Sequence, residues 1–96
     1  MDPKKVNPSN FKVESILFDN DYFSIAFGNW ENSKEFSIAM RWNGNDGGDV
    51  GYPKLFKNPV WFLIHNDLRT PIVKCLLELE CSENDLIIKA LSKLID

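Results

Sequence analysis

Residues that could carry out chemistry are few in this chain of 96 residues. His65 is the only histidine, and the carboxylates that could partner it are scattered through expected turns, so no nucleophile–base–acid set is indicated. Cys75 and Cys81 lie six residues apart, a spacing that fits neither a zinc knuckle nor a Cys-x-x-Cys motif. They are interpreted as buried or incidental thiols in a reducing cytosol. The sequence therefore predicts no enzyme and no metal site.

The glycine-rich stretch after Trp42 also lacks a ligand motif. It resembles a calcium loop superficially, and Gly48 falls at the sixth position counted from Asn43. The twelfth position, where calcium needs a bidentate Glu, is Lys54. The glycines match no phosphate-binding fingerprint either, so we expect no cofactor.

Alternation of apolar and polar residues predicts four strands. Their expected ranges are Phe11–Phe18, Tyr22–Phe27, Glu35–Trp42 and Trp61–Ile64. In the third strand, one set of alternate residues is expected to face the core: Phe36, Ile38, Met40 and Trp42. The other set, which includes Ala39 and Arg41, is expected to face solvent, giving a sheet with one wet face.

The remaining segments complete one domain over residues 1–96. Residues 1–10 are expected to form a loose arm, and residues 43–59 a long loop whose second half packs down through Tyr52, Leu55 and Phe56. Two C-terminal helices are predicted, the first with Thr70 as N-cap and Pro71 as its first residue, the second with Ser82 as N-cap. The predicted fold is α+β, an antiparallel β-meander of about four strands with both helices on one face.

Charge is unevenly distributed along the chain. The net charge is −3, yet the segment from Glu14 to Asp49 holds seven acids and only two bases. An acidic surface favours a basic partner, although charge that merely keeps the surface soluble explains it equally well. The expected partner-binding residues are Asp46, Asp49 and Tyr52 in the long loop, with Trp30 and Glu31 in a turn expected to neighbour it.

Two stretches carry a resemblance to a known family: Met40-Arg41-Trp42-Asn43 and the run from Gly51 to Phe62. In these the chain resembles small bacterial immunity proteins, the antidotes of polymorphic toxins in contact-dependent growth inhibition systems. The resemblance implies a cytoplasmic, non-catalytic protein that binds one cognate toxin C-terminal domain, a nuclease, and covers its active site. A nuclease holds phosphates and is therefore basic, which suits the acidic half of this chain.

Two other functions stay open. Aromatic residues on a sheet can stack single-stranded bases, so a single-stranded nucleic-acid-binding module is the alternative. The acidic balance argues against direct nucleic-acid binding. Such a module would need several cations to converge: Lys4, Lys5, Lys12, Arg41, Lys54 and Lys57. An enzyme subunit or scaffold that forms a homo-oligomer is the third. No membrane segment or signal peptide is expected, because no apolar run approaches about 18 residues.

Overall fold

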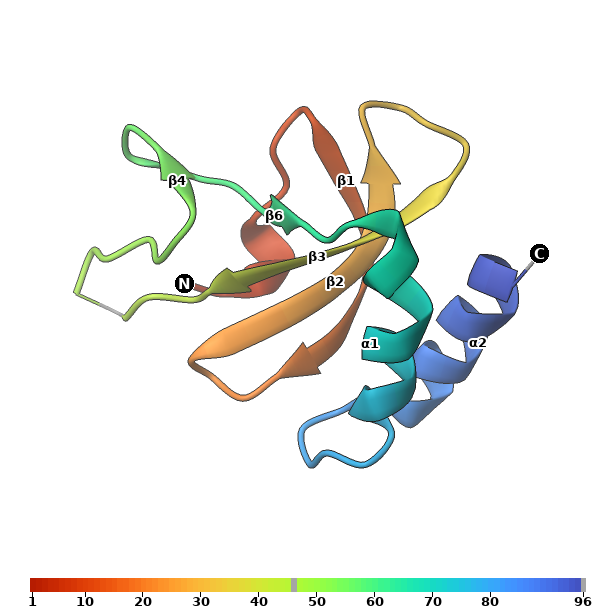
Figure 1. Ribbon diagram of the computed structural model, residues 1–96. Helices are drawn as coiled ribbons and strands as arrows, with labels where there is room; N and C mark the ends of the chain where they lie inside the picture. The colour runs from red at the N-terminus through yellow and green to blue at the C-terminus, as the bar shows by residue number, and fades with distance from the viewer. Residues whose placement is uncertain (46, 96) are drawn as a thin grey trace.

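Three long strands joined by tight turns and a short returning strand form one antiparallel sheet, in the order β1-β2-β3-β6. The computed structural model describes residues 1–45 and 47–95. Two C-terminal α-helices follow the sheet in the chain (Figure 1). The predicted α+β class, a meander with both helices on one face, is confirmed.

The elements have the following bounds. The main sheet comprises β1 (Phe11–Asp19), β2 (Phe23–Trp30), β3 (Phe36–Trp42) and β6 (Phe62–Leu63). A separate hairpin pairs β4 (Lys54–Leu55) with β5 (Asn58–Pro59). The helices are the 3-10 turns η1 (Pro3–Lys5) and η2 (Asn66–Leu68), followed by α1 (Arg69–Leu76) and α2 (Asn84–Ile95).

One face of the sheet, called the helix side, packs against α1 and α2. Its buried sheet residues Ile25, Phe27 and Ile38 meet Val73 of α1 and Ile87 of α2. These are the alternate positions predicted to face inward, so the strand and helix periods together produce this core.

The other face, called the arm side, was expected to be wet and is instead buried. Val6 from the N-terminal arm and Trp61 pack there with Phe11, Ala26 and Ala39. The indole N–H of Trp61 donates to the Val6 carbonyl at 2.6 Å, across 55 residues of sequence. The arm is therefore packed on the sheet rather than loose, and the predicted outward positions of β3 are covered.

Strand β1 departs from the expected alternation. Irregularities in its pairing with β2 fall between Val13 and Ser15 and between Ile16 and Phe18. Phe11 therefore packs on the arm side and Leu17 on the helix side, although the sequence placed both on one face.

The helix starts also differ from prediction. Helix α1 begins at Arg69 with Leu68 as N-cap, so Thr70 is not the cap and Pro71 is the third helical residue. Proline is tolerated there because first-turn amides lack a helical partner. Helix α2 begins at Asn84, and Ser82 forms an isolated bridge with Phe18 instead of capping it.

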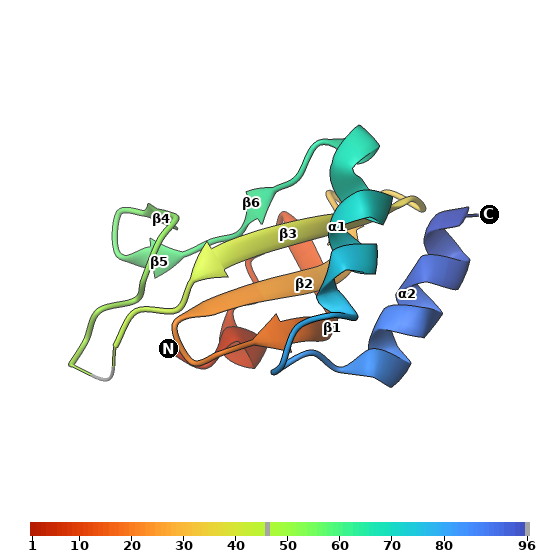
Figure 2. The same ribbon diagram turned by 60° about the horizontal axis from the view of Figure 1, so that its bottom comes forward.

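The helices do not extend over the whole helix side. They lie over the part of β2 and β3 away from the point where β3 ends, as both views show (Figures 1 and 2). We call the end where β3 finishes and β2 begins the Trp42 end, and the opposite end the Trp30 end. Exposure along β3 follows this cover, since Ile38 is buried, Met40 is half-buried and Trp42 is exposed.

Candidate functional site

A buried arginine organises the long loop at the Trp42 end. Arg41 is 1% exposed and lies on the arm side of β3, with its guanidinium carbon 5.9 Å from the centre of the Trp61 ring. The guanidinium donates to the carbonyls of Val60 at 2.5 Å and Pro53 at 3.4 Å, and also to the carbonyl of Val50. Burial lowers the pKa of the Arg41 guanidinium through desolvation.

The loop is tied to β3 by its backbone as well. Trp42 and Tyr52 exchange two backbone hydrogen bonds, of 2.7 and 3.1 Å. Gly51 allows this close approach, because its φ is +79° and an added Cβ would lie 2.0 Å from the Trp42 carbonyl oxygen. The second half of the loop is thus held by hydrogen bonds to β3. The expected apolar anchors Tyr52, Leu55 and Phe56 are all exposed.

An exposed aromatic row results on the helix side of the Trp42 end. Trp42 pairs with Phe23 of β2, their rings 4.8 Å apart at 70°, and bridges to Tyr52 on its other side. Met40, two residues earlier on the same face, pairs with Phe62. We call these five residues the aromatic ledge. Trp42, Tyr52 and Phe62 are 57%, 65% and 59% exposed, because the helices lie over the other part of the sheet (Figures 1 and 2).

The arm side of the same end carries acids. A cavity of about 560 Å³ is lined by Asp2, Asp19, Asp21 and Tyr22, together with residues of the loop start. The Asp19 carboxylate accepts from the Asp21 amide at 2.9 Å and from the Asn43 side chain at 3.1 Å, which fixes its position. The Trp42 end therefore presents aromatic rings on one side and carboxylates on the other.

The residues predicted to bind a partner do not form one site. Tyr52 and Asp49 lie at the Trp42 end, where the Asp49 carboxylate accepts from the Gly51 amide at 2.9 Å. Asp46 lies outside the described residues. Trp30 and Glu31 are at the far end of β2, about 23 Å along the strand from Phe23.

Trp30 also has a different environment from the one expected. It is the last residue of β2 rather than a turn residue, and it is half-buried against the arm-side cluster. Glu31 is exposed in the following turn. The sequence missed Trp42 and Phe62 as surface residues, because their strand phase matches that of the core.

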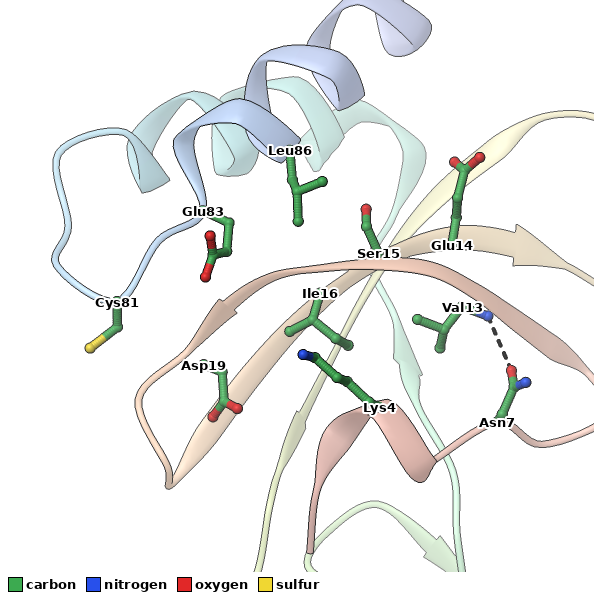
Figure 3. Close-up of a pocket in the computed structure, with 10 residues that line it drawn as sticks. All are labelled: Lys4, Asn7, Val13, Glu14, Ser15, Ile16, Asp19, Cys81, Glu83 and Leu86. Carbon is green, nitrogen blue, oxygen red and sulfur yellow. Dashed lines mark hydrogen bonds between the residues drawn. The ribbon is translucent and has the colours of Figure 1, made fainter.

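A larger cavity lies along β1. It has a volume of about 730 Å³, and Figure 3 shows its lining residues coming from η1 and the segment after it, from β1, and from α2 and the segment before it. Lys4 and the carboxylates of Glu14, Asp19 and Glu83 contribute its charge, and Asn7 accepts from the Val13 amide at 3.2 Å. This cavity is thus an open groove at the surface, with charged and polar side chains along it.

The remaining chemistry-bearing residues are at the surface. His65 is exposed, and its Nδ1 accepts from the Asp67 amide at 3.1 Å. Cys75 and Cys81 are exposed free thiols. Within residues 1–45 and 47–95, no three His, Cys, Asp or Glu side chains group closely enough to hold a metal ion.

The fold and this surface define the chain as a small α+β domain with an exposed aromatic end. No family model, curated protein or solved structure matches the chain. In the part of the chain that the structure describes, no helix has the length and apolar character needed to cross a membrane.

Proposed function

We propose that this chain is an immunity protein that binds a cognate toxin domain in the cytoplasm and covers its active site. The observation that carries the proposal is the aromatic ledge, an exposed apolar surface on a rigid end of the molecule. Exposed aromatic surface of this kind marks protein-binding sites, and Trp and Tyr are the residues that most often dominate their binding energy.

The rigidity of the Trp42 end supports docking without rearrangement. Tyr52 is held by backbone hydrogen bonds to Trp42, and the loop behind it is held by Arg41. A surface that is already ordered loses little conformational entropy when it binds. Trp42 and Tyr52 are therefore the proposed central contacts.

The partner chemistry follows from the charges at the same end of the sheet as the ledge, on its arm side. Asp19 and Asp21 line the arm-side cavity, and Asp49 lies in the adjoining loop. These carboxylates favour a basic partner and accelerate its approach. The resemblance to immunity proteins supplies the class of partner, a toxin domain that is basic because it acts on nucleic acid.

The test uses the cognate toxin domain, which is to be sought in the reading frame next to the one that encodes this chain. We expect Tyr52→Ala to weaken binding about 30-fold, as a central aromatic contact does. Asp49→Asn keeps the oxygen that accepts from Gly51 and removes only the charge, so it should slow association about threefold or more. Affinity is measured by titration calorimetry, and protection by survival of cells that express the toxin domain.

Glu31→Gln at the Trp30 end is the matched control, and its affinity should equal that of the wild type. A loss of affinity in Glu31→Gln with none in Tyr52→Ala would place the interface at the wrong end of the sheet. Wild-type protein that neither binds nor protects against the toxin domain would end the immunity proposal.

One observation favours the alternative, a single-stranded nucleic-acid-binding module. The ledge offers three exposed rings, and Lys54 and Lys57 are exposed on the neighbouring hairpin. Arg41 is buried, however, and both sheet faces carry packed clusters, which reduces the cationic surface available to phosphates. A gel-shift assay with short single-stranded oligonucleotides at moderate salt separates the two functions.

A further inference from the structure

The hairpin of β4 and β5 projects from the Trp42 end with an apolar tip. Leu55 pairs with Asn58, so Phe56 and Lys57 form a two-residue turn. Phe56 is 94% exposed, and Leu55 next to it is also exposed. Figures 1 and 2 both show this hairpin standing away from the sheet and the helices.

The position of Phe56 is unfavourable for the isolated chain in two ways. Its φ of +59° lies in the left-handed region, where a bulky non-glycine residue is strained. Two-residue hairpin turns with positive φ at the first turn position favour glycine there. The ring also stays in water in the folded chain, so no burial of the ring offsets the free-energy cost of the strained backbone.

The base of the hairpin is fixed. The Val60 amide donates to the Pro53 carbonyl at 3.1 Å, and Arg41 donates to the carbonyls of both residues. A tip with a strained, exposed aromatic residue therefore stands on a base that is tied to the core strand β3. Strain of this kind is concentrated at sites that contact ligands or partners.

We propose that the tip of this hairpin is an insertion element, in which Phe56 and Leu55 enter an apolar pocket of the partner protein. Lys54 and Lys57 flank the tip and are exposed, so the matching pocket carries carboxylates at its rim. This inference rests on the proposed function, because the partner is the toxin domain. It adds a second contact, of opposite charge, to the one made by the ledge and the acids.

A protein pocket suits the tip better than a membrane or a nucleic acid does. Two lysines near an anionic bilayer contribute only about 1 kcal/mol each, and the chain as a whole has a net charge of −3. The same net charge opposes approach to phosphates. A single rigid aromatic ring gains binding energy by filling a preformed apolar pocket, and this needs no extended basic surface.

The test compares Phe56→Gly with wild type in binding to the toxin domain. Glycine relieves the positive φ, so the melting temperature should stay the same or rise by a few degrees, while affinity should fall at least about tenfold. Lys54→Glu with Lys57→Glu should also weaken binding. Ile88→Ser is the apolar control, because Ile88 is 59% exposed on α2, and Lys34→Glu is the charge control.

Each outcome decides between the explanations. Affinity of Phe56→Gly within about twofold of wild type, with protection retained, overturns the insertion element and leaves the proposed function standing. An equal loss in Ile88→Ser or Lys34→Glu also overturns it, since the effect is then not local to the tip. Absence of any wild-type binding overturns both proposals. The proposal that the tip enters a protein pocket is also overturned if Phe56 is required for binding to oligothymidylate, or to vesicles made of equal parts of phosphatidylcholine and phosphatidylserine.

Discussion

At the scale of single residues, Arg41 determines the shape of the loop that leads into β6. Three loop carbonyls converge on one guanidinium that is shielded from water. Charge-assisted hydrogen bonds are stronger than neutral ones, and removal of the donor leaves carbonyls without a partner. Arg41 therefore connects the core sheet to Val50 and Pro53, on either side of Tyr52, and to the base of the β4–β5 hairpin.

Replacement of Arg41 by Met keeps much of the apolar contact with Trp61 and removes every donor to the loop. We expect the free energy of unfolding to fall by about 2–3 kcal/mol. Amide exchange at Tyr52 and Val60 should rise at least about tenfold, because their hydrogen bonds close the base of the loop. Thermal denaturation and hydrogen-exchange mass spectrometry measure the two effects.

Arg69→Met provides a matched control. Arg69 also donates to backbone carbonyls, those of Asn66 and Phe36, but it does so at the Trp30 end. Its replacement should leave exchange in residues 50–60 unchanged. Equal loosening of that loop in both variants would refute a specific role for Arg41.

At the scale of elements, the N-terminal arm acts as a cover for the arm side of the sheet. Val6 is buried, and its carbonyl accepts from the Trp61 indole. The sequence indicated a loose arm because residues 1–10 are rich in proline, asparagine and lysine. Local composition cannot reveal that one residue, Val6, is buried through its contact with Trp61, 55 positions away.

Deletion of residues 1–6 tests this cover. We expect the free energy of unfolding to fall by about 3 kcal/mol, from lost apolar burial and the lost indole hydrogen bond. Tryptophan emission should shift to longer wavelength as Trp61 becomes exposed. Lys5→Ala, which changes an exposed arm residue, should alter neither quantity; a deletion that is as stable as wild type would show that the arm contributes nothing.

The existence and type of the long elements were predictable from the sequence, whereas the phase of β1 and the first residues of the helices were not. The inward phase of β2 and β3 was correct, since Phe27 and Ile38 occupy the helix-side core. The phase of β1 was wrong beyond its irregularities, and both helix starts were misplaced. Bulges and helix ends depend on contacts with other elements, such as the bridge of Ser82 to Phe18.

At the scale of the whole molecule, the acidic segment is divided between the two ends of the sheet. Asp19, Asp21 and Asp49 belong to the Trp42 end, whereas Glu31 and Glu35 flank the turn at the Trp30 end. The segment is acidic in sequence and does not form one acidic face. Among residues 1–45 and 47–95, exposed aromatic rings and acids occur together only at the Trp42 end.

This division predicts how salt affects binding. The association rate with the proposed partner, a basic toxin domain, should fall about tenfold between roughly 10 and 150 mM salt, because steering by exposed charges is screened. Asp21→Asn should reduce that dependence, whereas Glu35→Gln at the other end should not. Stopped-flow tryptophan fluorescence measures the rates, and identical salt dependence in Asp21→Asn and wild type would argue against steering by this end.

The sequence by itself determined the α+β class, the meander and the alternate faces of β2 and β3, because these follow from local spacing of apolar residues. Only the tertiary structure decided which parts of those faces are covered. Trp42 has the phase of a core residue and is exposed, because the helices lie over the other part of the sheet. Arg41 has the phase of a surface residue and is buried, because Trp61 and the long loop cover it. Burial depends on segments distant in sequence, and the candidate site lies where that cover ends.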